Sequence, residues 1–191
     1  MEIDREILKK INSLPNPMLI AISGFGGSGK STAAEKLGAY LDAPVIGVDS
    51  FARHRLSGGT AWNSVDFGRL EREVLKPFEA GQNPLVYGHY DWSSNGIVTT
   101  APVEHRGRLI VEGVGLFRPE LYQYFSYMLW IDCPLEEAAA RGKKRDREIH
   151  NNPQDERWDG VWKRNDLEYL AAYKPDEMAN AVIKNEKIDL T

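Results

Sequence analysis

The 191-residue chain has a single cysteine and no long apolar run, and both shortages restrict what it can be. Cys133 cannot form an internal disulfide, so nothing indicates an oxidising compartment, and we expect it to be a small buried residue at a strand end. No stretch approaches the roughly 20 apolar residues that are needed to cross a bilayer. The N-terminus lacks the basic start and apolar core of a signal peptide. We therefore expect a cytoplasmic protein without a membrane partner.

The chain also lacks the excess of positive charge that is typical of nucleic-acid-binding proteins. It has 24 Lys and Arg against 28 Asp and Glu, a formal net charge of −4. We expect no nucleic-acid partner, although a local basic pocket can still bind a small anion such as a nucleotide. The sequence shows no internal repeat and no low-complexity linker, so residues 1–191 predict one domain with a substantial core.

Short apolar runs alternate with longer helical patterns, which predicts an α/β sheet built from crossover units. Fully apolar runs are expected of parallel strands that are covered on both faces. The runs are 19–23, 45–48, 109–111, 128–131 and 181–183. The helical stretches are 31–41, 67–80, 136–147 and 154–173, with a short amphipathic helix near residues 3–11.

One region breaks this alternation and predicts an inserted β-hairpin. Residues 84–92 and 96–103 form two β-like segments around a turn at 93–96. We expect the hairpin to lie over one end of the sheet, where insertions often determine specificity. Within it, Tyr90 and Trp92 flank Asp91. Such a pair can enclose a ring while the acid accepts hydroxyl hydrogen bonds, and simple packing is the alternative.

Residues 24–31 form a complete G-x-x-x-x-G-K-S phosphate-binding loop between an apolar run and a helix-forming stretch. Glycines let successive N–H groups point into one concavity, and the following helix adds the positive end of its dipole. We expect Lys30 to reach the β- and γ-phosphates of a nucleotide and Ser31 to ligate Mg²⁺. The residues expected to bind the nucleotide are Gly24, Gly26, Gly27, Ser28, Gly29, Lys30, Ser31 and Thr32.

Two acids follow predicted strands at the sheet edge where ligands bind in open parallel sheets. Asp49 follows the second run, where it would serve as a general base that directs a substrate hydroxyl onto the γ-phosphorus. A turn or helix-capping aspartate is the alternative. Glu112 ends the third run, where it would hold Mg²⁺, in part through water. A solvated loop acid is the alternative for Glu112.

Arg141 and Arg145 lie one helical turn apart, and two guanidinium groups facing a closing site could neutralise charge on a transferring phosphoryl group. A solvated helix face is the alternative. Trp158 and Trp162 are also four residues apart, and we expect them to pack between helices.

These motifs resemble the uridine kinase branch of the phosphate-loop kinases, with phosphoribulokinase and bacterial pantothenate kinase as wider relatives. The resemblance covers about residues 19–183. It rests on residues 24–32, Asp49-Ser50-Phe51, Tyr90-Asp91-Trp92, Val111-Glu112-Gly113 and the arginine-rich segment 141–147.

The resemblance implies a P-loop NTPase-type fold, a five-stranded parallel sheet flanked by helices. It implies a substrate-side hairpin at 84–103, a helical lid at 141–160 and the cofactors ATP and Mg²⁺. The roles that it implies are Asp49 as base, Ser31 and Glu112 at the metal, Arg141 and Arg145 on the phosphates, and Asp66, Tyr90 and Trp92 at the acceptor.

The expected activity is transfer of the γ-phosphoryl group of ATP to a hydroxyl of a small metabolite, a nucleoside in the first place. Uridine kinases place a histidine shortly after Tyr-Asp-Phe, whereas this chain has Ser93, Ser94 and Asn95 there. A kinase for a sugar, pantothenate or a nucleotide therefore remains an alternative, as does a regulatory NTPase without a small acceptor. The resemblance also allows a homo-oligomer.

Overall fold

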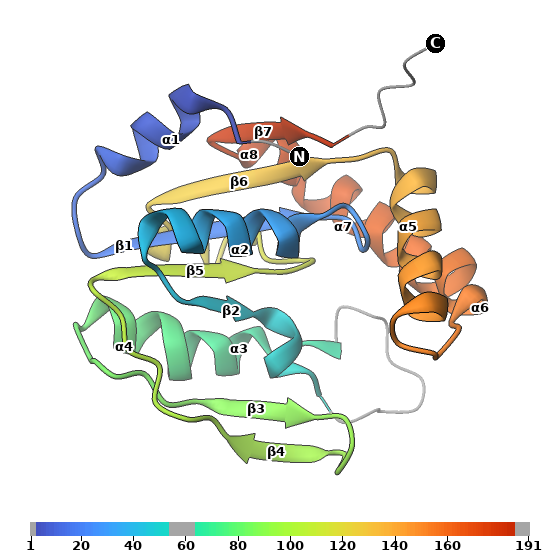
Figure 1. Ribbon diagram of the computed structural model, residues 1–191, viewed down its shortest axis with the longest axis horizontal. Helices are drawn as coiled ribbons and strands as arrows, with labels where there is room; N and C mark the ends of the chain where they lie inside the picture. The colour runs from blue at the N-terminus through green and yellow to red at the C-terminus, as the bar shows by residue number, and fades with distance from the viewer. Residues whose placement is uncertain (1–2, 54–63, 186–191) are drawn as a thin grey trace.

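Five parallel strands form the central sheet, in the order β2-β5-β1-β6-β7 (Figure 1). The structure is a computed structural model that describes residues 3–53 and 64–185. The strands are β1 (Met18–Gly24), β2 (Val45–Gly47), β5 (Arg108–Glu112), β6 (Tyr127–Asp132) and β7 (Ala181–Lys184). Each lies within one residue of its predicted bounds, and all four pairings are parallel. The predicted fold class is therefore confirmed.

The helices match the predicted stretches closely, except for a short helix at 175–178 that was not predicted. They are α1 (Arg5–Asn12), α2 (Lys30–Leu41), α3 (Phe67–Leu70), α4 (Lys76–Glu79), α5 (Leu135–Glu148), α6 (Asp155–Arg157), α7 (Lys163–Tyr173) and α8 (Pro175–Met178). Two π-helical segments, η3 (Glu71–Leu75) and η5 (Trp158–Trp162), connect α3 to α4 and α6 to α7. In the described part of the chain, no helix is long and apolar enough to cross a membrane.

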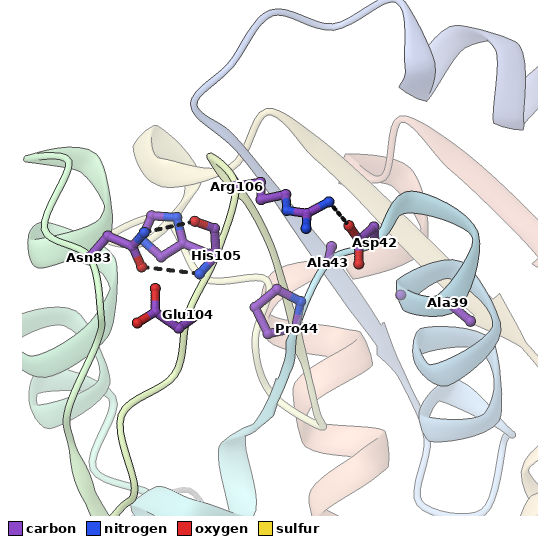
Figure 2. A pocket seen from close by; sticks show the side chains of 9 residues that line it. Ala39, Asp42, Ala43, Pro44, Asn83, Glu104, His105 and Arg106 are labelled. Atoms are coloured by element: carbon purple, nitrogen blue, oxygen red, sulfur yellow. Dashed lines mark hydrogen bonds and ion pairs between the residues drawn. The ribbon is translucent and has the colours of Figure 1, made fainter.

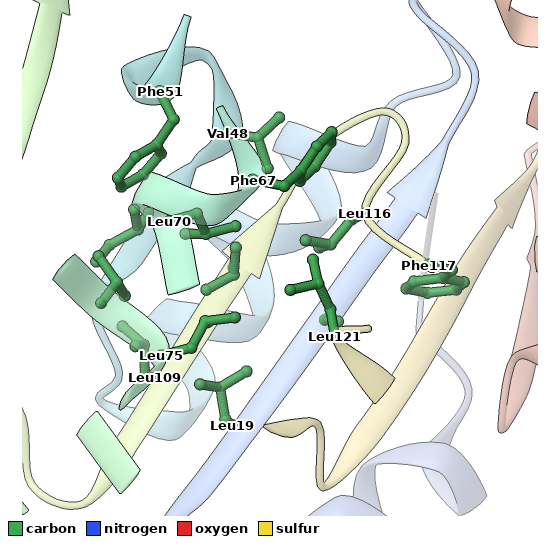
Figure 3. Packing of buried hydrophobic residues seen from close by; sticks show 14 of the residues in the cluster. Leu19, Val48, Phe51, Phe67, Leu70, Leu75, Leu109, Leu116, Phe117 and Leu121 are labelled. Atoms are coloured by element: carbon green, nitrogen blue, oxygen red, sulfur yellow. The ribbon is translucent and has the colours of Figure 1, made fainter. Parts of the chain in front are cut away.

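The central strand β1 explains why the sheet is covered on both faces. All seven of its residues are buried, and neighbouring side chains point to opposite faces. Ile20 and Ile22 pack with α1 and α2, whereas Leu19 and Ala21 belong to the cluster on the other face. Figure 3 shows part of that second cluster, in which Leu70, Leu109 and Leu121 are among the side chains that surround Leu19.

The predicted hairpin is present as a separate two-stranded antiparallel sheet, β3 (Gly88–Asp91) and β4 (Gly96–Thr99). From the sequence we expected the hairpin over one end of the central sheet, and it does not lie there. Instead it lies beside the α3–α4 helix (Figure 1). There Arg69 donates to Gly88 O, and Glu73 accepts from Gly88 N–H. The hairpin also contacts η1 (Val48–Phe51), the short 3₁₀ helix that follows β2, through Ser50. It is thus placed beside the carboxyl end of β2.

Candidate phosphate and acceptor site

The phosphate-binding loop joins the end of β1 to the start of α2, as the sequence predicts. Gly27 and Gly29 have φ angles of 81° and 99°, in the left-handed region that favours glycine. A Cβ atom at Gly27 would lie 2.1 Å from Ala138 O, so this position accepts no side chain. Gly29 precedes the first residue of α2 and cannot cap it with a side chain, which leaves the first-turn N–H groups for an anion. Thr32 is exposed in that first turn.

Ser31 and Glu112, the two predicted magnesium ligands, lie together. Ser31 Oγ donates to Glu112 Oε1 at 3.1 Å. The second carboxylate oxygen, Glu112 Oε2, is buried and has no hydrogen-bond partner among the described residues. Burial and the nearby charge of Asp49 raise the pKa of Glu112, against the lowering effects of Lys30 and Ser31.

A buried carboxylate oxygen without a partner, next to a hydroxyl, fits a hard cation such as Mg²⁺, which prefers oxygen ligands. Within residues 3–53 and 64–185, no group of three or more His, Cys, Asp or Glu side chains is arranged to hold a metal. A magnesium ion at Glu112 would therefore also need oxygens from phosphate groups and water.

Lys30 and Asp49 approach the same carboxylate from different elements. Lys30 begins α2, and its Nζ lies 3.5 Å from Phe25 O within the loop. Asp49 lies in η1, is exposed, and makes no side-chain hydrogen bond to another described residue. The charges of both influence the pKa of Glu112. The fold thus gathers the four predicted groups at the carboxyl ends of β1, β2 and β5.

The two predicted lid arginines contact protein acceptors in this structure. Arg141 donates to Glu137 Oε1 at 2.5 Å and to Asn185 O at 3.0 Å. Asn185 Nδ2 in turn donates to Ser28 O at 2.7 Å, so Arg141 lies beside the phosphate-binding loop. Arg145 lies one turn further along α5 and forms an ion pair with Asp146.

The predicted lid, residues 141–160, includes Trp158, which packs as expected. Its indole N–H donates to Asp146 Oδ2 at 2.7 Å. Its ring lies against two glycines, because a Cβ atom would come within 3.0 Å of the ring at Gly26 and 2.3 Å at Gly142. This ring therefore joins α5 to the phosphate-binding loop.

Asp166 is a residue of this region that the sequence interpretation missed. It accepts a hydrogen bond from Gly26 N–H at 3.1 Å and is 5% exposed. Burial raises its pKa to about 6, against the effects of the Gly26 hydrogen bond and the Lys30 charge. A signal was available, because Asp166 is the one acid in a helical stripe of aromatic residues. The stripe is Trp158, Trp162, Asp166, Tyr169 and Tyr173.

A cavity of about 240 Å³ lies between η1, the start of α3 and the hairpin. It is lined by Ala52, Arg53, Asp66, Arg69, Tyr90, Asn95, Gly96 and Ile97. Asp66 and Tyr90 were predicted to bind the acceptor. Ala52 and Arg53 directly follow η1, so the cavity lies next to the segment that carries the predicted base, although Asp49 itself is not a lining residue.

The aromatic pair of the hairpin does not form the two walls expected from the sequence. Tyr90 and Trp92 lie on the same side of β3 and meet edge to face, with ring centroids 4.8 Å apart. Trp92 is 63% exposed, whereas Tyr90 is buried and donates its hydroxyl to Asn95. Asp91 accepts hydrogen bonds from Ser93 and Ser94 and stabilises the turn. Of the two rings, only that of Trp92 is exposed, and the Tyr90 ring packs against it.

A larger cavity, of about 650 Å³, lies at the opposite end of the sheet (Figure 2). It is formed by the end of α2, the segment before β2 and the segment before β5. Arg106 pairs with Asp42 on one side, and Asn83 exchanges hydrogen bonds with the His105 backbone on the other. Because it lies at the amino ends of the strands, size alone does not make it the site of the chemistry.

Comparison with known proteins identifies the fold. A family model described as "AAA domain" matches residues 20–159. A possible uridine kinase from Bacillus stearothermophilus is 18% identical, with a TM-score of 0.72 over 93% of this chain and 95% of that one. A protein provisionally described as a fructose transport system kinase, from Silicibacter sp. TM1040, is 24% identical, with a TM-score of 0.74 over the same shares.

A sugar kinase from Janibacter sp. HTCC2649 is 19% identical, with a TM-score of 0.51 over 90% of this chain and 86% of that one. No curated protein matches the chain. At these identities, the likeness shows a P-loop kinase fold and leaves the substrate open.

Proposed function

Because the chain belongs to the AAA domain family, we propose that it is an ATP-dependent kinase that phosphorylates a hydroxyl group of a small metabolite. The observation that carries the proposal is the juxtaposition of two sites. Lys30, Ser31 and a Glu112 oxygen without a hydrogen-bond partner among the described residues lie near Asp49. The cavity lies beside Ala52 and Arg53, which follow the short helix that carries Asp49. A nucleotide site and an acceptor site thus share one candidate base.

In the proposed reaction, an acceptor hydroxyl oxygen forms a bond to the γ-phosphorus of ATP, and the bond to the β–γ bridging oxygen breaks. ADP leaves, and Asp49 takes the hydroxyl proton. Lys30 and the first-turn N–H groups of α2 hold the phosphates. Ser31 and Glu112 would hold Mg²⁺, which when bound neutralises charge on the phosphate oxygens.

Arg141 and Arg145 would contribute positive charge after rearrangement of the lid, residues 141–160. The whole of residues 1–191 would act as one kinase domain, with the hairpin region 84–103 on the acceptor side. Positioning and charge neutralisation account for most of the catalysis in such a site.

Among acceptors, a nucleoside is the first candidate because of the sequence resemblance. The exposed Trp92 and the cavity-lining Tyr90 would contact its ring, and Asp66 would contact its sugar. A regulatory NTPase without an acceptor is the second candidate. The cavity lined by Asp66 and Tyr90 favours the kinase, since a regulator needs no such cavity.

Two substitutions test the proposal in an assay of ADP release with a panel of hydroxylated acceptors. Lys30→Ala should abolish turnover, because the phosphates lose their main cation. Asp49→Asn should lower kcat by about 10²–10⁴-fold while the KM for ATP stays close to that of the unmodified protein. Lys9→Ala and Asp42→Asn, exposed ion-pair residues far from the loop, serve as controls.

Near-normal turnover of Lys30→Ala would remove the loop from the mechanism. Equal losses of turnover and ATP binding in Asp49→Asn would make Asp49 a structural residue. Slow ATP hydrolysis that no acceptor stimulates would favour the regulatory NTPase.

A further inference from the structure

The cavity beside η1 carries more positive than negative charge. Its ionisable lining residues are Arg53, Arg69 and Asp66, two cations and one anion, which leaves one positive charge. Tyr90 and Asn95 add polar but neutral groups. The chain as a whole carries a formal charge of −4, so a positive cavity is a local departure from its surroundings. A small cavity with an excess of positive charge attracts anions.

The single acid of the cavity is already used by the protein. Asp66 Oδ1 accepts a hydrogen bond from Arg69 N–H at 2.9 Å and lies 3.3 Å from the Arg53 guanidinium. Burial opposes ionisation of Asp66, yet the Arg69 hydrogen bond and the Arg53 charge outweigh it, so its pKa is lowered. Asp66 is therefore ionised at neutral pH, caps α3 and neutralises Arg53.

The second cation, Arg69, is not neutralised in this way. It is 6% exposed, and its guanidinium donates to Ser50 O at 2.8 Å and Gly88 O at 3.2 Å. The same group lies 5.0 Å from the ring centre of Phe51. No carboxylate in the described part of the chain forms an ion pair with it, and the neighbouring Glu73 accepts from Gly88 N–H instead. A buried guanidinium whose hydrogen bonds go to carbonyl oxygens is stabilised further when an anion binds to it.

On the assumption of the proposed kinase function, we infer that the acceptor is a hydroxylated anion, which carries a carboxylate or phosphate group besides the hydroxyl that is phosphorylated. This inference replaces the uncharged nucleoside, which the sequence resemblance alone favours. The oxyanion binds to Arg53 and Arg69, and its hydroxyl end points toward Asp49. Guanidinium groups suit this task because they bind oxyanions through charge-assisted hydrogen bonds. The volume of about 240 Å³ is small for a ligand site and favours a compact acceptor.

Three compounds with one carbon skeleton test the inference. Glycerol 3-phosphate carries a phosphate, glycerate carries a carboxylate, and glycerol carries no charge. Calorimetric titrations of the full chain in saturating ADP and Mg²⁺ keep the probes out of the phosphate-binding loop. We expect at least one of the two anions to bind and glycerol not to bind, and the stronger of the two identifies the oxyanion.

Substitutions in the cavity give the sharper result. Arg53→Gln should weaken anion binding about tenfold or more, since a charged hydrogen bond is lost. Asp66→Asn should tighten it, because the opposing charge is removed while asparagine still caps α3. Arg69→Lys retains the charge and should still bind, which separates charge from the structural role of Arg69. Arg106→Gln, at the far cavity, is the matched control.

The inference is overturned if neither anion binds, if glycerol binds as well as they do, or if Asp66→Asn weakens binding. The kinase proposal fails by a different result. In that case the protein would bind the anion normally but would transfer no phosphoryl group from ATP.

Discussion

At the scale of the residue, Asp166 shows how much one buried group depends on its neighbours. Its carboxylate meets the N–H of Gly26, and Lys30 lies close enough to affect its pKa. Because burial raises that pKa from 3.8 to about 6, the folded protein binds this proton more tightly than the unfolded chain does. Between these two values the free energy of unfolding falls as the pH rises.

Asp166→Asn should therefore stabilise the protein above pH 6 and leave its stability nearly unchanged at pH 4. The amide oxygen can still accept from Gly26, and the cost of a buried charge disappears. Each pH unit between the two pKa values corresponds to about 1.4 kcal/mol. The free energy of unfolding of Asp166→Asn should therefore exceed that of the unmodified protein by at most about 3 kcal/mol. Urea denaturation of both proteins from pH 4 to 7 measures it.

The difference between the two proteins is the quantity to compare, since Glu112 also has a raised pKa and gives both a pH dependence. Asp159→Asn, at an exposed carboxylate that pairs with Lys143, is the control. A stability difference that stays constant from pH 4 to 7 would contradict the assignment.

At the scale of the element, the packing of α5, η5 and the phosphate-binding loop supports the nucleotide site. Helical periodicity predicts α5 and the 154–173 stretch from sequence. It cannot predict that the ring of Trp158 fills the space above Gly142 and beside Gly26, because that contact depends on how two helices cross. The loop is therefore held by residues far along the chain.

Gly142→Ala should destabilise the protein and weaken ATP binding. Helix propensity alone predicts the opposite, a gain of about 0.5–1 kcal/mol, since alanine is the better helix former. In this structure a Cβ atom would lie 2.3 Å from the Trp158 ring. Overpacking of this kind costs about 1–3 kcal/mol. Thermal denaturation and ATP titration test both effects.

Gly160→Ala provides the matched control within η5, since no atom lies within 4 Å of a Cβ there. It should leave stability and ATP binding nearly unchanged. Equal effects of the two substitutions would show that Trp158 does not support the loop.

At the scale of the whole molecule, the parallel sheet brings distant parts of the sequence to one edge. β5 pairs with both β1 and β2, so Glu112 lies in register with Ile22 and with Gly47. The phosphate-binding loop and η1 follow these two strands directly. The same topology places the larger cavity, of about 650 Å³, at the other end, where neither predicted site lies.

Binding of ATP and Mg²⁺ should raise the melting temperature of the whole chain. A ligand at one hundred times its Kd adds about 2.7 kcal/mol to the free energy of unfolding, if it binds only the folded state. ATP with EDTA should give a smaller shift, because Ser31 and Glu112 then contribute no metal bridge. Equal shifts with and without Mg²⁺ would remove the metal role of Glu112.

The sequence by itself determined the strands, the phosphate-binding loop and the acids at the strand ends, since these follow from local patterns. Periodicity, glycine spacing and the end of an apolar run all act within a few residues. Only the tertiary structure decided that Asp166 contacts Gly26 and that Tyr90 and Trp92 meet edge to face. It also decided that Arg69 lies buried beside the smaller cavity, with no ion pair to a carboxylate in the described part of the chain. These features depend on contacts between elements that are distant in the chain. Burial determines the free-energy cost of each charged group, and a local sequence pattern does not predict that burial.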